Sequence, residues 1–150
     1  MRQFRRILHP TDFSKASRAA FAKAVTLAKR NRAELLVVHV LPLLTPFIAD
    51  GYSYVSPKTY ETMEAAAKRD AQLRLAALVA RARNVKVRAR GALLDGTPHQ
   101  AISRTARSKR ADLIVMGTHG RTGLSKFFLG SVAARVIPLA PCPVLTVRGK

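Results

Sequence analysis

The chain has 150 residues, 48% of them hydrophobic, which fits one globular domain over residues 1–150 with a core of its own. No apolar run approaches the ~18 residues that a membrane-spanning helix needs, and the basic amino-terminal segment lacks the apolar stretch of a secretory signal. The single Cys142 has no partner for an internal disulfide, so we expect a reducing, cytoplasmic environment.

The charge of the chain is unusual. Twenty-seven basic and eight acidic residues give a net charge of +19, and the basic residues concentrate in residues 2–32 and 68–90. A surplus of this size attracts polyanions. Three interpretations stay open. The charge reflects a high-salt or Arg-rich background of the source, it aids solubility, or it serves contact with nucleic acid. No nucleic-acid-binding motif in the sequence supports the third one.

The amino-terminal part predicts two strands with a helix between them. The first strand covers residues 4–9 and ends at Pro10. The polar side chains that follow it, in the segment PTDFS, offer caps for a helix with apolar positions between residues 16 and 28. The run ELLVVHVL, Glu34–Leu41, is continuous and apolar, which is typical of a central parallel strand buried on both faces.

The next part predicts a long loop, a long helix and an edge strand. Residues 42–58 are rich in Pro and Gly, and we expect them to form a lid, a partner surface or a segment packed on its own domain. A helix is expected over residues 59–83. Its buried stripe consists of Met63, Ala66, Ala67, Leu73, Ala77 and Ala80. Residues 85–93 alternate apolar and basic side chains, which indicates an edge strand with one wet face.

The last third continues the alternation. Thr97 is expected to cap a helix that begins at Pro98. Beyond it we expect a strand over residues 111–116, a helix over residues 131–139 and a last strand over Val144–Val147. Five strands that alternate with four helices predict a parallel α/β sheet with right-handed crossovers. His9 and His39, near strand ends, are expected to be neutral, hydrogen-bonded packing residues, because two histidines without carboxylates make a poor metal site.

The segment GTHGRTGLSKFFLGS follows the fourth predicted strand and leads into a helix. Backbone N–H groups left free at such a helix start, with the positive end of the helix dipole behind them, form an anion site, and phosphate is the expected anion. Gly117 would let a ligand approach the main chain, Gly120 would let N–H groups point inward, and Gly130 would leave room for a phosphate. Ser131 either caps the helix or donates its hydroxyl to a phosphate oxygen. The alternative is a plain strand-to-helix loop in which the glycines serve the turns.

The spacing Gly117-x2-Gly120-x9-Gly130-Ser131 resembles the ATP-binding signature of the universal stress protein family, G-x2-G-x9-G-[ST]. The segments ILHPTDFSKAS, DGTPHQAI and APCPVLTVR are similar to recurring segments of that family and follow in the same order, so the resemblance spans the chain. It implies a Rossmann-like open parallel sheet of five strands, in the order 3-2-1-4-5, with helices on both faces. Strands 1 and 4 would then be neighbours at a topological switch point.

The resemblance also implies a site for ATP. The phosphates would lie against Gly117, Gly120, Gly130, Ser131 and the N–H of Val132, with Arg121 adding positive charge. The adenosine part would lie against Pro10, Thr11, Asp12, Val40 and Met116. Asp12 has an alternative role as a helix cap. ATP would bring Mg²⁺, although no carboxylate is an evident ligand for it. The family also commonly forms homodimers through the last strand, here Val144–Val147.

These observations favour an ATP-binding module of a stress response or of signalling, and no catalytic residue is assigned. A weak ATPase or phosphotransfer enzyme is an alternative, with His119 as the candidate for positioning water. A basic adaptor for nucleic acid or another polyanion is a further one. The sequence has neither G-x4-G-K-[ST] nor G-x-G-x-x-G after its first strand, which argues against a Walker-type nucleotidase and a dinucleotide-binding domain.

Overall fold

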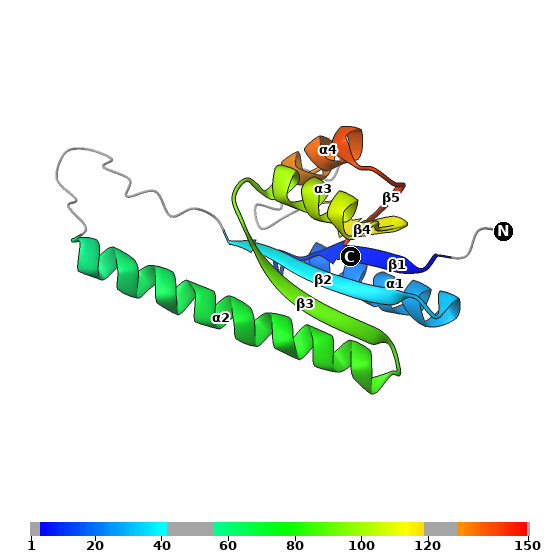
Figure 1. Ribbon diagram of the computed structural model, residues 1–150, viewed down its shortest axis with the longest axis horizontal. Coiled ribbons are helices and arrows are strands. Elements are labelled where there is room, and N and C mark those ends of the chain that lie inside the picture. Colours follow the sequence, from blue (N-terminus) through cyan, green and yellow to red (C-terminus); the bar gives the residue numbers. More distant parts are fainter. Residues whose placement is uncertain (1–3, 42–55, 119–128, 150) are drawn as a thin grey trace.

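The computed structural model describes residues 4–41, 56–118 and 129–149. They form a five-stranded parallel sheet of order β3-β2-β1-β4-β5 with helices on both faces (Figure 1), so the predicted fold class and strand order are confirmed. In chain order the elements are β1 (Arg6–Pro10), α1 (Lys15–Asn31), β2 (Glu34–Leu41), α2 (Pro57–Asn84), β3 (Arg88–Asp95), α3 (Pro98–Ser108), β4 (Leu113–Gly117), α4 (Ser131–Val136), the 3-10 helix η1 (Ile137–Leu139) and β5 (Val144–Val147).

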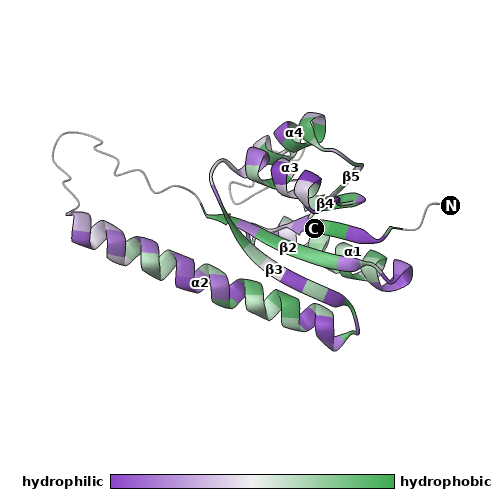
Figure 2. Cartoon of the chain, in the orientation of Figure 1, coloured by the Kyte–Doolittle hydropathy of each residue, from purple (hydrophilic) through white to green (hydrophobic). Residues whose placement is uncertain are grey.

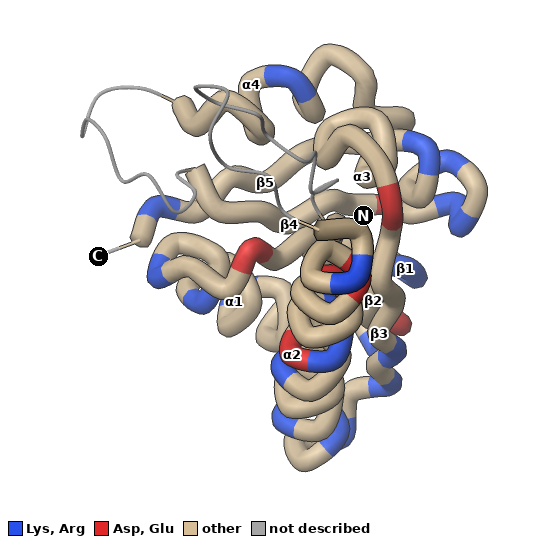
Figure 3. Tube along the Cα trace, turned by 90° about the vertical axis from the view of Figure 1, so that its left-hand side faces the viewer, with Lys and Arg blue, Asp and Glu red and all other residues tan. Residues whose placement is uncertain are grey.

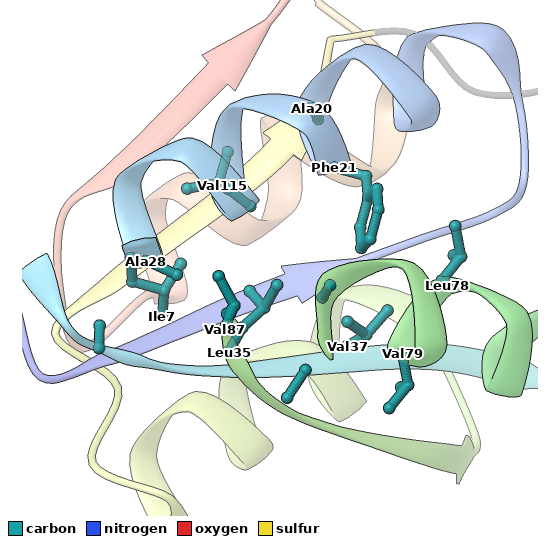
Figure 4. Close-up of a cluster of buried hydrophobic side chains, with 14 of the residues drawn as sticks. Ile7, Ala20, Phe21, Ala28, Leu35, Val37, Leu78, Val79, Val87 and Val115 are labelled. Atoms are coloured by element: carbon teal, nitrogen blue, oxygen red, sulfur yellow. The ribbon is translucent and has the colours of Figure 1, made fainter. Parts of the chain in front are cut away.

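Two apolar clusters hold the layers together. In the first, α1 and α2 cover one face of the sheet, and Figure 4 shows Phe21, Leu78 and Val79 from these helices over side chains of β1 and β2. In the second, Ile102 of α3 and Ala133 and Val136 of α4 pack on the other face. In Figure 2 the apolar colour covers most of β2, whereas β3 also carries hydrophilic bands. Because β2 contributes buried residues to both clusters, its predicted burial on two faces is confirmed.

The predicted buried stripe of α2 is wrong. The residues that α2 buries are Ala71, Leu75, Leu78, Val79 and Ala82. Met63 is 54% exposed and Leu73 is 68% exposed. The amino-terminal half of α2 extends past the sheet (Figure 1), and Met63, Ala66 and Ala67 of this half stay exposed. In the other half, the larger side chains of Leu75, Leu78 and Val79 take the face toward the sheet because they bury more apolar area than alanines.

Other local predictions also differ from the structure. β3 begins at Arg88, later than predicted, because Lys86 has a φ of 66° that ends the preceding turn. Thr97 occupies the N-cap position of α3, but its side chain makes no capping hydrogen bond. The last predicted helix divides into α4 and η1, and Gly130 rather than Ser131 is the N-cap of α4.

Cys142 is half-buried, and burial raises the pKa of its thiol. Among the described residues, no helix is long and apolar enough to cross a membrane.

Candidate functional site

The strands β1 and β4 separate at their carboxyl ends. β1 pairs with β2 as far as Pro10, opposite Val38, but with β4 only as far as Leu8, opposite Ile114. Pro10 is the predicted end of the first strand, but β1 includes it. The N–H of Thr11 then makes one more hydrogen bond to β2, at the carbonyl of Val38. The chain leaves β1 toward β2 and leaves β4 toward β5, on opposite sides of this point. Open α/β sheets bind their ligands at such a switch point.

Hydrogen bonds fix the backbone that follows β1. The N–H of Thr11 donates to the carbonyl of Val38 at 2.8 Å, and Nδ1 of His39 donates to the carbonyl of Thr11 at 2.7 Å. The hydroxyl oxygen of Thr11 accepts from the Phe13 N–H at 3.0 Å and from the Ser17 hydroxyl at 2.7 Å. Thr11 thus ties the loop to both β2 and α1.

Asp12 lies beside the beginning of α1. Its Oδ1 accepts from the N–H of Ser14 at 3.0 Å, and Ser14 is the N-cap that in turn accepts from the N–H of Ser17. The carboxylate therefore supports the capping residue instead of capping the helix itself. A carboxylate accepts several hydrogen bonds, so this bond is compatible with the predicted role of Asp12 toward a nucleotide.

His9 bridges the gap between β1 and β4. Its ring is fully buried, and Nδ1 donates to the carbonyl of Val115 at 2.8 Å, beyond the last main-chain pair of the two strands. Burial lowers the pKa of His9 to about 4, so the ring is neutral at neutral pH. The contacts of His9 and of His39 agree with the predicted packing role. Their function as braces of the site was not visible in the sequence, because the partner carbonyls lie 106 positions from His9 and 28 positions from His39.

Gly117 has a packing role that the sequence analysis did not predict. A Cβ at this position would lie 2.9 Å from the carbonyl carbon of Ala16, closer than real side chains come. The glycine lets the first turn of α1 pack directly on the end of β4, next to the candidate site. A ligand that approaches the main chain at Gly117, as predicted, would have to come from the side that does not face Ala16.

We expect Gly117→Ala to lower the free energy of unfolding by about 1–3 kcal/mol, because the backbone of Ala16 cannot move aside as a flexible side chain can. Chemical denaturation followed by circular dichroism measures it. Gly96→Asn is the matched control, since Gly96 has open space around it and its φ of 106° lies on the positive side, which asparagine tolerates better than most residues. A Gly117→Ala variant as stable as the wild type would contradict the packing role.

The two ends of the glycine segment are joined. The N–H of Gly130 donates to the carbonyl of Thr118 at 2.5 Å, and the N–H of Thr118 donates to Val147 of β5 at 3.0 Å. This pair holds the start of α4 next to the end of β4. Thr118 is buried, and nothing in the sequence singled it out. Gly120, Arg121 and His119 lie outside the described residues.

Gly130 has backbone angles of φ −56° and ψ 147°, which every residue type can adopt. The next two residues, the exposed Ser131 and the half-buried Val132, form the start of the first turn of α4. The backbone conformation at Gly130 therefore does not require glycine, whereas a left-handed turn would favour it. Met116 is buried in the second cluster, and Val40 is partly buried against it. The structure brings Pro10, Met116 and Gly130 to one end of the sheet.

The family follows from a comparison with known proteins. The sequence model of the Universal stress protein family matches residues 3–148. The chain belongs to the universal stress protein family. Universal stress protein MJ0531 of Methanocaldococcus jannaschii is 37% identical over 148 residues, which cover 97% of this chain and 82% of that protein.

Solved structures of the family share the fold. The structure of MJ0577, a universal stress protein of the same archaeon, has a TM-score of 0.81 at 27% identity and covers 99% of both chains. A universal stress protein family protein of Arabidopsis thaliana with AMP bound has a TM-score of 0.69 at 20% identity, covering 97% of this chain and 92% of that one. At that identity the second likeness shows the fold alone.

Proposed function

We propose that this universal stress protein binds an adenine nucleotide, with ATP as its ligand, and works as a nucleotide-dependent module of a stress response or of signalling. The observation that carries the proposal is Gly130, a glycine that the backbone does not need, at the first turn of a helix and tied to the end of β4. A missing side chain there leaves main-chain N–H groups open to a phosphate. The Arabidopsis protein, which has the same fold, has AMP bound, so this fold can hold an adenine nucleotide.

The residues present fit an adenine nucleotide in their chemistry. The main-chain N–H groups of Ser131 and Val132 would bind phosphate oxygens, with Gly117 alongside and with Gly120 and Arg121 from the segment beyond Thr118. The carboxylate of Asp12 can accept from ribose hydroxyls. Apolar contacts for the base would come from Pro10, Val40 and Met116, with Thr11 holding the loop in place. ATP would bring Mg²⁺ as part of the ligand.

Two measurements test the proposal. The purified protein is denatured, and any small molecule that it releases is identified by mass spectrometry. Calorimetry with ATP, ADP and AMP then gives the affinity of the emptied protein. We expect saturable binding of an adenine nucleotide at one site per chain. No released nucleotide together with no heat from any of the three would overturn the proposal.

We also propose that the chain forms a homodimer through β5, residues Val144–Val147. This strand lies at the edge of the sheet. Leu145 is 37% exposed, and Ile137 and Leu139 of the neighbouring η1 are 44% and 45% exposed, so an open edge and an apolar surface lie together. A second copy that adds its strand to this edge would satisfy the free main-chain groups and cover the apolar surface.

We expect Leu145→Asp to weaken the dimer by at least about tenfold in Kd, because it places two like charges in the interface. Light scattering across a dilution series measures the effect. Leu73→Asp is the matched control, since Leu73 is more exposed and lies far from β5 on α2. Equal behaviour of the two variants would show that β5 is not the interface.

A further inference from the structure

The end of the sheet opposite the candidate site collects basic side chains. The strands begin there and α1, α2 and α3 finish there, on the right-hand side of Figure 1. Figure 3, viewed along the sheet, shows basic positions far outnumbering acidic ones along the trace. We define the basic pole by six exposed residues, Arg6, Arg32, Lys86, Arg90, Lys109 and Arg110. This surface is separate from the proposed nucleotide site, at the other end of the strands.

Three helices end at this pole in the same way. In each turn a residue of left-handed conformation follows the helix: Arg32 with φ 52°, Lys86 with φ 66° and Arg110 with φ 51°. In each turn the N–H of the next residue donates to a carbonyl five residues back: Ala33 to Ala28, Val87 to Ala82 and Ala111 to Ala106. This is the Schellman pattern, in which glycine is the usual left-handed residue.

All three turns therefore carry a cation where the backbone favours glycine. A side chain in the left-handed region is disfavoured, and glycine would avoid that strain. Attraction to the negative ends of the helix dipoles accounts for cations in the last helical turns. It does not account for Arg6 and Arg90, which lie on strands of the same end. The shared feature of these positions is positive charge presented at one end of the sheet.

The cations also surround a cavity. It has a volume of about 560 Å³, lies on the sheet face next to the end of α3, and has Arg6, Arg90, Lys109 and Arg110 along its lining. Its floor is formed by apolar residues of the first three strands, such as Leu8 and Leu36. The lining therefore combines an apolar floor with a positively charged rim.

The acidic residues near the pole are already engaged. Glu34 forms a salt bridge with Arg90, and Oδ2 of Asp112 accepts from the N–H groups of Arg5 and Arg6 at 2.8 Å each. Among the described residues of this end, the charges of Arg32, Lys86 and Arg110 face no acidic partner in a salt bridge. These three side chains stand at the starts of β2, β3 and β4, and Arg6 stands on β1 between them.

We propose that the basic pole binds the phosphate backbone of a nucleic acid without reading its sequence. One cation per strand across four neighbouring strands makes a row of ~14 Å, since strands lie ~4.8 Å apart, and duplex DNA carries several phosphates over that length. A row of this length exceeds what a single small anion contacts. All six defining residues are Arg or Lys, the side chains that neutralise phosphates, and none is an aromatic or amide residue, so we expect contacts to the backbone.

The test uses the triple variant Arg32→Gly, Lys86→Gly, Arg110→Gly. Each change removes a charge and also relieves a left-handed side chain, so we expect the melting temperature to stay equal or to rise. Fluorescence anisotropy with a short labelled DNA duplex measures binding from low to physiological salt. We expect an affinity loss of about tenfold or more at low salt and a decrease of about 3 in the slope of log Kd against log salt.

The matched control is Lys23→Gln, Arg69→Gln, Arg135→Gln, which removes the same charge from exposed helix positions away from the pole. It should bind DNA nearly as the wild type does. An equal loss in both triple variants would overturn the proposal, because binding would then follow net charge alone. Equally tight binding of polyglutamate of matched charge would also overturn it, by showing that the surface accepts any polyanion. Addition of ATP should leave DNA binding at the pole intact.

Discussion

We expect Gly130→Val to lower the affinity for ATP by about a hundredfold or more, equivalent to roughly 3 kcal/mol of binding free energy. Valine can adopt the φ of −56° and ψ of 147° found at this position. The main-chain bond from residue 130 to the Thr118 carbonyl does not depend on the side chain, so it should persist. The new side chain would occupy the space in front of the first turn of α4, where a phosphate would bind. Calorimetry with ATP measures the loss.

The stability of this variant separates a site effect from a folding effect. Replacing an N-cap glycine by an apolar residue costs at most about 1 kcal/mol, so thermal unfolding should change little. Leu129→Val is the matched control, because it places the same side chain at the exposed neighbouring position and should keep the wild-type affinity. If Gly130→Val bound ATP as the wild type does, the phosphates would not lie at this helix.

The second large effect that we expect is a loss of stability on acidification that depends on His9. Burial holds the pKa of His9 at about 4 in the folded protein, against the ordinary value of 6.5 in the unfolded chain. Between these values the unfolded chain binds a proton that the folded protein does not, so the free energy of unfolding falls as the pH falls. From about pH 7 to about pH 4.5, this one group should remove about 2–3 kcal/mol.

The variant His9→Gln isolates this contribution. Its amide can still donate toward the Val115 carbonyl, but it does not titrate, so its stability should fall less with acid than that of the wild type. Urea denaturation at several pH values gives the difference between the two proteins. His99→Gln, on α3, should keep the wild-type dependence. Parallel curves for wild type and His9→Gln would refute the assignment of the acid effect to His9.

Much of the fold was accessible from the sequence because local patterns carry it. The continuous apolar run ELLVVHVL predicted β2 with the bounds that the structure has, since a strand buried on two faces needs such a run. Proline at a first helical position marked the start of α3. The order of the strands was accessible only through the resemblance to the family, which rests on the glycine spacing and on three recurring segments.

The structure decided what depends on contacts between distant segments. The sequence of α2 offers several apolar stripes, and only the position of the helix on β2 and β3 selected Leu75, Leu78 and Val79. Gly117 looked like a loop glycine, and the structure adds a packing role for it, because Ala16 approaches it from another part of the chain.

By itself, then, the sequence determined the elements, the glycine segment and a charge of +19, because composition and periodicity are local properties. The tertiary structure decided where that charge lies. The parallel arrangement brings three helix ends to one end of the sheet, and so gathers Arg32, Lys86 and Arg110 from across the chain. The same arrangement sets β1 beside β4 and makes His9 a brace at the opposite end, a role that no local pattern encodes.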